Sequence, residues 1–262
     1  MKGTKKIGIA TMKYHGQRIH LIDTPGFDDT NLDDVEILET IAQYLTGSSD
    51  RRVRLSGVIY LHRITDPRVG GTALKNIRMF RGLVGNRSMK NAALVTTMWG
   101  NVKRQDGEMR MNQLRETDEF WGQMIESGAT CDKYDNTRQD GLRILKMLIQ
   151  KSPCTLQIQL EMEGGVKLAN TTAGREVNER IEELKAEHQK DMAKLRKEMQ
   201  QVQEERDEAR FEMIKREYEA AVNKVAEANE AQARLLQATI DEQQSQIRAL
   251  QTKKDGIVCI VM

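Results

Sequence analysis

One short segment of the sequence combines residue types that could bind a magnesium-bound triphosphate. Leu21–Asp29 reads LIDTPGFDD, in which an apolar run ends at Asp23 and a turn containing Gly26 follows. In nucleotide-hydrolysing switches, a carboxylate at a strand end sits beside magnesium, and a glycine N–H reaches the terminal phosphate. An ordinary Pro-Gly turn gives the same letters. Because a strand precedes the motif and an α/β pattern follows it, we favour the phosphate-binding interpretation.

The residue after Gly26 bears on hydrolysis. Many switches have a glutamine there that orients the attacking water, whereas this sequence has Phe27. An aromatic ring cannot position water by hydrogen bonding, so we expect slow intrinsic hydrolysis and assign no catalytic residue. The four histidines have no metal-ligand or triad-like spacing, and no Ser/His/Asp nucleophile motif is recognisable.

The C-terminus carries a second chemical signal. The last four residues, Cys259-Ile260-Val261-Met262, fit a prenylation motif of the farnesyl type, with Cys259 as the lipidated residue. Two lysines just upstream, at 253 and 254, suit contact with anionic lipid. The alternative is a chance apolar tail at a frayed helix end. Position and pattern together favour a prenyl anchor that attaches the protein to a membrane surface.

Composition narrows the classes of partner. The formal net charge is only +2, so no field of one sign indicates a nucleic-acid partner. The three cysteines are far apart, which fits neither a zinc site nor a disulfide framework and indicates a reducing setting. No signal peptide and no apolar stretch of membrane-spanning length is visible. We therefore expect a cytoplasmic protein, membrane-associated on the cytoplasmic face where the lipid is attached.

The first part of the chain alternates predicted strands and helices. Strands are expected at Ile7–Tyr14 and Gln17–Asp23, joined by a His15-Gly16 turn, and at Leu55–His62 and Ala92–Met98. Amphipathic helices are expected at Asp33–Leu45, Thr72–Val84, Gly107–Glu126 and Thr137–Gln150. Strands that alternate with helices predict an α/β fold with a doubly wound parallel sheet, which carries the Asp23 motif at a strand end.

The second part has a different period. A turn-rich linker is expected at 156–174. Residues 175–254, which follow it, contain neither Gly nor Pro. Apolar positions recur in steps of three and four from Val177 to Leu250, with one stutter, which predicts a long α-helical coiled coil. Polar seam residues such as Asn229 reduce stability but can select register and partner. The partner is a second copy or another helix, and a solvated single helix is the alternative.

The first 150 residues resemble the AIG/IMAP-type GTPases, a septin-related branch of the Ras-like P-loop proteins, and most closely their fungal single-G-domain type. The matching stretches are LIDTPGFDDT at Leu21–Thr30, LSGVIYLHRITDPRVGGTALKNIRMFRGLVG at Leu55–Gly85, ALVTTMWG at Ala93–Gly100 and YDNT at Tyr134–Thr137. The resemblance implies a partial Ras-like fold at residues 1–155, guanine-nucleotide (GTP or GDP) and magnesium binding, and GTP hydrolysis as the family activity.

The resemblance also assigns roles to single residues. Asp23 would be linked to magnesium through water, and Gly26 would contact the γ-phosphate. Thr97 lies in the place of the guanine-specificity motif, where the family expects an aspartate and this sequence has Trp99-Gly100. Asn136 stands where relatives place a residue beside the base. Helix capping is an equally good explanation of Asn136, since a helix is predicted to start just after it.

The sequence departs from the family at its front. Nothing in the 262 residues matches Gly-x-x-x-x-Gly-Lys-Ser/Thr, the P-loop whose backbone and lysine supply most of the grip on phosphate. By resemblance the first strand, the P-loop and the first helix are missing. That strand would lie between the strands Gln17–Asp23 and Leu55–His62, so its absence would leave two apolar edges unless they re-pair or another chain inserts.

Three interpretations follow for function. The leading one is a guanine-nucleotide-binding protein of the GTPase family, impaired in nucleotide binding and hydrolysis. The rival is a non-catalytic scaffold that acts through its coiled coil and a prenyl-type tail at residues 255–262. The third is part of an intact switch whose gene start was misplaced, for which a P-loop encoded upstream of Met1 would be the evidence.

Overall fold

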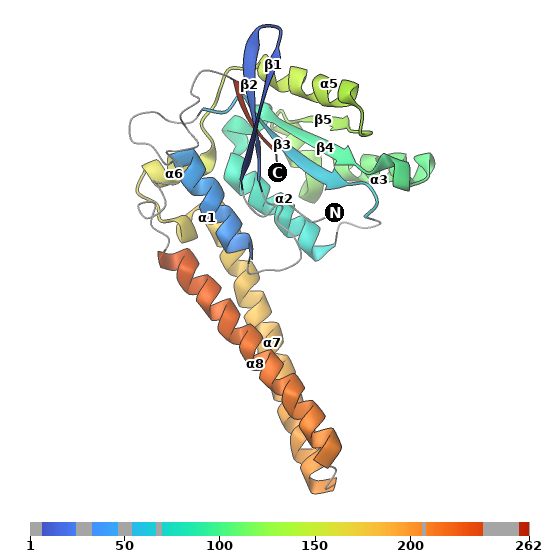
Figure 1. Ribbon diagram of the computed structural model, residues 1–262, viewed down its shortest axis with the longest axis vertical. Coiled ribbons are helices and arrows are strands. Elements are labelled where there is room, and N and C mark those ends of the chain that lie inside the picture. The colour runs from blue at the N-terminus through green and yellow to red at the C-terminus, as the bar shows by residue number, and fades with distance from the viewer. Residues whose placement is uncertain are drawn as a thin grey trace.

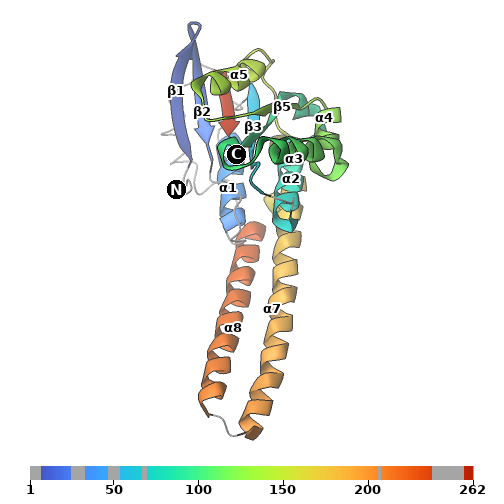
Figure 2. The ribbon, with the colours of Figure 1, turned by 90° about the vertical axis from the view of Figure 1, so that its right-hand side faces the viewer.

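The protein consists of an α/β body from which two long helices project side by side (Figures 1 and 2). The computed structural model describes residues 7–24, 33–46, 54–66, 70–205, 208–237 and 257–261. We call the two projecting helices the stem. Among the described helices, none is both long enough and apolar enough to cross a membrane.

The body contains a sheet of six strands in the order β1-β2-β6-β3-β4-β5. The strands are β1 (Gly8–Tyr14), β2 (Gln17–Asp23), β3 (Gly57–Arg63), β4 (Ala92–Thr97), β5 (Thr130–Lys133) and β6 (Ile257–Val261). β1 and β2 form the predicted antiparallel hairpin, whose turn residues His15 and Gly16 both have positive φ, as this tight turn requires. The other neighbours pair in parallel, which confirms the predicted α/β class.

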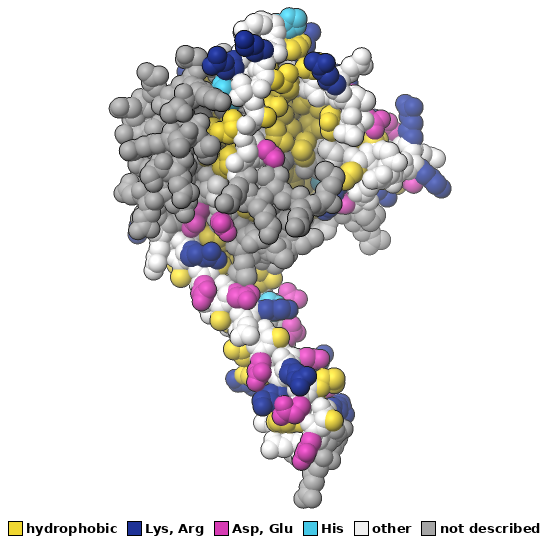
Figure 3. Space-filling view, viewed as in Figure 1, with side chains coloured by type: hydrophobic (Ala, Val, Ile, Leu, Met, Phe, Trp, Pro, Cys, Tyr) yellow, Lys and Arg dark blue, Asp and Glu magenta, His cyan; other side chains and the backbone are white. Residues whose placement is uncertain are grey.

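Helices cover the two faces of the sheet unequally. The helices of the body are α1 (Asp33–Thr46), α2 (Gly71–Val84), α3 (Arg104–Glu116), α4 (Gln123–Glu126), α5 (Arg138–Ile149) and α6 (Gln157–Glu163). The main core forms on the face covered by α1 and α2, whereas α5 packs on the other face against Ile59, Val95 and Cys259. On that second face Leu61 stays 42% exposed, and apolar side chains remain visible beside the β1–β2 hairpin (Figure 3).

The predicted helix at Gly107–Glu126 is divided in the structure. α3 ends at Glu116, a five-residue π-helical turn follows at Asp118–Gly122, and α4 continues from Gln123. Thr117 has extended backbone angles, which interrupt the helix. Trp121 in the π turn is fully buried. Its burial under the sheet gives the bulge a packing role that helical periodicity does not reveal.

The central strand position is filled by the chain's own residues. β6 lies between β2 and β3, where the sequence predicted a gap, and pairs in parallel with both of them. The main chain also connects across this join, because Thr24 N donates to Val261 O at 3.2 Å. Residues 257–261 were expected in a prenylation-type tail. Their sequence, Ile-Val-Cys-Ile-Val, is apolar on both faces and β-branched at every position except Cys259, which suits a strand buried from both sides.

The stem is a helical hairpin. α7 (Thr172–Glu205) and α8 (Glu208–Gln237) run antiparallel, so the single helix expected over residues 175–254 is two helices over its described part. They are tied together by Arg196 Nε, which donates to the Tyr218 hydroxyl at 2.7 Å. The predicted seam of α8 is correct only in part. Tyr218 and Gln232 contact α7 as expected, whereas Ala221 and Ala228 are buried in place of Val222 and Asn229, which are exposed. A coiled coil with a partner helix stays a prediction.

Buried contacts join the stem to the body. Arg180 of α7 forms an ion pair with Asp34 of α1, at 2.7 Å between Nη1 and Oδ2, and both side chains are almost fully buried. Arg180 Nη1 also approaches Asn76 Oδ1 of α2 at 3.3 Å. Val177 and Ile181 extend the body's core into the stem. Because α1 begins just beyond the Asp23 segment, this junction fixes the direction in which the stem leaves the body.

Candidate functional site

The candidate site is the edge at which the parallel strands end. β2, β6, β3, β4 and β5 run in the same direction, so their carboxyl ends lie along one edge of the sheet. In open α/β sheets ligands bind in the crevice outside this edge. Asp23, Thr97 and Asn136 all come from strand ends or from residues just after them. The predicted site residue Gly26, and Phe27 after it, lie outside the described residues.

Asp23 ends β2 beside the central strand. Its Cα is paired with Gly8 on one side and with Val261 on the other, and the residue is exposed. The next residue, Thr24, is buried, and its Oγ1 donates to Val261 O at 3.0 Å. Thr24 therefore fastens the end of β2 to β6 and leaves Asp23 as the carboxylate that reaches solvent at this point of the edge.

Thr97 is part of the join between β3 and β4. Its Oγ1 donates to His62 O at 3.3 Å, and its carbonyl accepts from Ile64 N at 3.0 Å. Three strand intervals separate Thr97 from Asp23, a distance of about 14 Å at ~4.8 Å per interval. The structure thus places the two residues on one edge without direct contact between them.

The place of the expected guanine-specificity motif is occupied by contacts within the protein. Met98 has a left-handed backbone, and Trp99 Nε1 donates to Thr96 Oγ1 at 3.0 Å. Lys133 Nζ lies 4.4 Å from the centre of the Trp99 ring and 2.5 Å from Glu108 Oε1. The hydrogen bond from Lys133 lowers the pKa of the Glu108 carboxyl. Trp99 and Lys133 thus bind each other where a base-recognising carboxylate was expected.

Asn136 is exposed at the turn between β5 and α5. It has a φ of 58°, and the Tyr134 hydroxyl donates to its Oδ1 at 3.5 Å. The alternative role of helix cap belongs to the next residue, because Thr137 Oγ1 accepts from Asp140 N at 3.1 Å. The left-handed conformation explains the asparagine at this position and leaves part of its side-chain amide facing solvent.

An arginine that sequence reasoning missed fixes this turn. Arg143 donates through Nε to Asp132 Oδ2 at 2.8 Å, and through Nη1 to Asp140 Oδ1 at 2.6 Å. Hydrogen bonds from Thr137 and Arg143 lower the pKa of the Asp140 carboxyl. The spacing Thr137-x-x-Asp140 was the available signal, since an N-cap threonine with an acidic residue three positions later marks a helix start.

Cys259 does not lie at a free surface. It is fully buried in β6, between Leu21 of β2 and Gly57 of β3, and packs in the cluster that includes Leu148 of α5. Burial raises the pKa of its thiol to about 12. A prenyltransferase needs an accessible thiolate, so attachment of lipid to Cys259 requires β6 to leave the sheet.

The described edge fits magnesium and nucleotide only in part. Asp23 offers one carboxylate, and no group of three or more His, Cys, Asp or Glu residues suited to a metal ion occurs in the described ranges. The Thr24 hydroxyl is directed to Val261 O. A triphosphate needs several main-chain N–H groups and a lysine, and these described residues provide no such loop. The residues present therefore suit a weak, partial contact.

No known family model matches the chain. A search of curated proteins finds no matching sequence. The resemblance to AIG/IMAP-type GTPases therefore remains a prediction from the quoted motifs.

Proposed function

We propose that this chain is a guanine-nucleotide-binding protein of the GTPase family, with a partial Ras-like fold, whose nucleotide binding and hydrolysis are impaired. The observation that supports this proposal is the placement of Asp23, Thr97 and Asn136 along one carboxyl edge of a mainly parallel sheet. That edge is the usual ligand position in open α/β folds. Asp23 lies on one side of the central strand, and the other two residues lie on the other side.

The role that we propose for each residue along the edge follows from its chemistry. Asp23 would hold magnesium through water, and the N–H of Gly26 would contact the γ-phosphate. The exposed amide of Asn136 would contact the base, with Thr97 holding β3 and β4 together beneath it. Because the sequence contains no P-loop motif, most of the usual phosphate contacts are missing. We therefore expect a dissociation constant of about 1 mM, or about −4 kcal/mol.

A titration of the purified chain with GTP, with and without magnesium, tests this proposal by calorimetry or fluorescence. We expect weak binding that prefers GTP to ATP and that Asp23→Asn weakens further in magnesium. Asp66→Asn is the matched control, since Asp66 follows strand β3, which β6 separates from β2, and forms an ion pair with Arg63. Absence of any GTP binding at millimolar concentration would remove the nucleotide proposal. Tight, magnesium-dependent binding would remove the claim of impairment.

A second candidate function is a membrane-anchored scaffold that acts through its helices, with a prenyl group on Cys259. The length of the stem favours it, since two helices of 34 and 30 residues project from the body. However, strand pairing and lipidation of Cys259 exclude each other, because the thiol is buried between β2 and β3. This candidate therefore requires a form of the protein in which β6 is outside the sheet.

Incubation of the full chain with farnesyltransferase and labelled farnesyl diphosphate tests the scaffold candidate. We expect no label on the folded chain, and label on a peptide of residues 253–262, which cannot form the sheet. Cys259→Ser in the peptide is the control for the labelled atom. Rapid stoichiometric labelling of the folded chain would show that β6 leaves the sheet readily and would favour the anchored scaffold.

A further inference from the structure

β1 forms an open edge of the sheet. It stands first in the strand order and, among the described residues, pairs only with β2. Figure 2 shows it as the outermost strand. Edge strands are usually protected by proline, a bulge, a short length or several charges. β1 has seven residues, an unbroken register with β2, no proline and one charge, at Lys13. This edge is therefore suited to accept another strand.

The hairpin turn determines which main-chain groups of β1 point outward. In a two-residue turn with positive φ at both central residues, the flanking residues Tyr14 and Gln17 exchange hydrogen bonds. Bonded and non-bonded pairs then alternate along the two strands. The N–H and C=O groups of every second residue therefore point away from β2, at Ile9, Thr11 and Lys13. No other described backbone group bonds to these three residues.

The edge is complementary to a reversed copy of itself. With Thr11 opposite Thr11 of the second copy, all seven residues of β1 are paired. The three outward N–H groups of each copy then donate to the other copy, which makes six hydrogen bonds. Ala10, which is exposed, lies opposite Met12, which is half-buried. Gly8 lies opposite Tyr14, and an aromatic ring can cover a glycine in this arrangement.

We propose that β1 pairs with β1 of a second copy in antiparallel orientation, so that the two sheets become one. Charge selects this orientation. Lys13 and Arg18 are exposed near the hairpin turn, where Lys and Arg side chains gather (Figure 3), and Asp23 is exposed at the other end of the hairpin. Reversal brings the basic end of each copy to the Asp23 end of the other. It also separates the two Lys13 residues by about 14 Å along the strands, whereas a parallel pair would place them side by side.

The stem takes no part in this contact. β2 and β6 point toward the stem, so reversal directs the two stems away from each other (Figures 1 and 2). Gly8 is paired with Asp23 on its other side, so Tyr14 of the second copy lies on the same face as Asp23, two strand intervals or about 10 Å away. The second copy thus brings an aromatic residue near the candidate site. Only this last point rests on the proposed function, because the strand pairing needs no nucleotide.

Sedimentation velocity of the full chain, from about 1 µM to about 500 µM, tests the pairing. One strand is a small interface, so we expect a reversible dimer with a dissociation constant on the order of 10–100 µM. Thr11→Pro removes the central outward N–H and should weaken association at least tenfold. The hairpin should remain folded, because proline is tolerated where the N–H of an edge strand faces solvent. Circular dichroism and urea unfolding verify this.

Thr11→Ala is the matched control for the proline variant. Both variants lose the hydrogen bond between Thr11 Oγ1 and His20 Nδ1, which are 3.0 Å apart, but only proline loses the main-chain N–H. Thr11→Ala should therefore dimerise as wild type does. Equal loss of association in the two variants would overturn the proposal, since it would show that the outward N–H makes no bond to a second copy.

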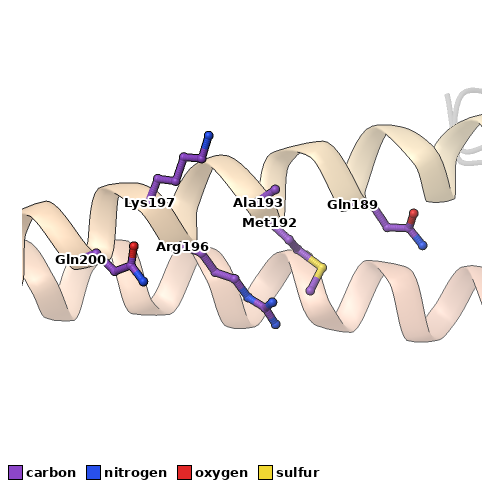
Figure 4. A pocket seen from close by; sticks show the side chains of 6 residues that line it. All are labelled: Gln189, Met192, Ala193, Arg196, Lys197 and Gln200. Carbon is purple, nitrogen blue, oxygen red and sulfur yellow. The ribbon is translucent and has the colours of Figure 1, made fainter.

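The stem supplies a second control. A shallow hollow of ≈ 420 Å³ lies along α7, far from β1, and Figure 4 shows the residues that line it, which are Gln189, Met192, Ala193, Arg196, Lys197 and Gln200. Ala193→Glu adds a charge to this hollow and should leave the dimer unchanged. Loss of the dimer in Ala193→Glu, with its retention in Thr11→Pro, would overturn the proposal, because association would then occur through the stem.

Cross-linking tests the register. Chains with Ala10→Cys and chains with Met12→Cys, both in the background Cys131→Ser/Cys154→Ser, should form a disulfide when they are mixed, since these positions lie opposite each other. Neither chain alone should do so, because like positions are two residues out of register and too far apart for a disulfide. Linkage of like positions as fast as of mixed ones would contradict the pairing. A wild-type chain that stays monomeric at the highest concentration would overturn the proposal and leave the edge for a strand of another protein.

Discussion

At the scale of single residues, a buried ion pair between Asp34 and Arg180 joins the body to the stem. Both side chains are almost fully removed from water, so each charge depends on the other for compensation. A buried ion pair adds little net stability over an apolar pair of similar volume, but it defines one geometry strictly. Here that geometry is the docking of α7 on α1.

Substitution at this pair should therefore be costly when only one partner changes. Asp34→Asn or Arg180→Met leaves an uncompensated buried charge, which costs about 3–5 kcal/mol of unfolding free energy. The double variant Asp34→Leu/Arg180→Met removes both charges and should be more stable than either single variant. Urea unfolding measures all three free energies. Additive losses in the double variant would show that the two side chains do not interact.

His62 provides a residue-scale prediction about pH. Burial lowers its pKa, so the folded state binds this proton less readily than the unfolded chain does. The unfolded chain gains the proton as pH falls below about 6.5, which lowers folding stability from there down to the folded-state pKa. His62→Gln should show a smaller loss of folding stability between pH 7 and pH 5 than wild type, as urea unfolding at each pH measures. Equal pH slopes for the two proteins would contradict this cause.

At the scale of elements, β6 decides whether the sheet is continuous. It joins the β1–β2 hairpin to the rest of the sheet, and the two strands beside it do not pair with each other. Ile260 is buried on one face of β6 and Cys259 on the other. A charged residue in this strand should therefore release it and expose the thiol.

Thiol reactivity measures this release. In a chain with Cys131→Ser and Cys154→Ser, the remaining Cys259 should react with a thiol reagent far more slowly than a free thiol does. Adding Ile260→Asp should speed the reaction at least tenfold, because a buried carboxylate has no partner in the core. Met213→Asp on the exposed stem is the control. Fast reaction of Cys259 without Ile260→Asp would contradict the buried position.

The elements also show what the sequence could and could not predict. The hairpin around His15-Gly16 and the alternation of strands with helices were predictable, because turn chemistry and periodicity are local. β6 was not predictable, because five apolar residues fit a tail as well as a buried strand. Only its pairing with β2 and β3, which are distant in the sequence, identifies it as a strand. Half of the seam between α8 and α7 was also unpredictable, because the exposed Val222 and Leu236 fit helical spacing as well as the buried Ala221 and Leu235 do. Asp23 could be placed at a strand end, whereas the contact between Trp99 and Lys133 depended on tertiary packing.

At the scale of the whole molecule, the last described strand of the chain completes a sheet that the first strands begin. The hydrogen bond from Thr24 to Val261 joins residues 237 positions apart in the sequence. This closure produces the continuous carboxyl edge along which the proposed nucleotide contacts lie. The arrows of β2 and β6 point toward the stem, so this edge faces the side of the body from which the stem projects (Figures 1 and 2).

The most direct test of this account is a disulfide between β2 and β6. Leu21 and Cys259 are paired across the two strands on the same face, so Leu21→Cys in the chain with Cys131→Ser and Cys154→Ser should form an intrachain disulfide on mild oxidation. Mass spectrometry of the digested protein should find this bond at every protein concentration, and Met12→Cys, one strand farther away, should not form it. Failure of Leu21→Cys to cross-link within one chain would contradict the central position of β6.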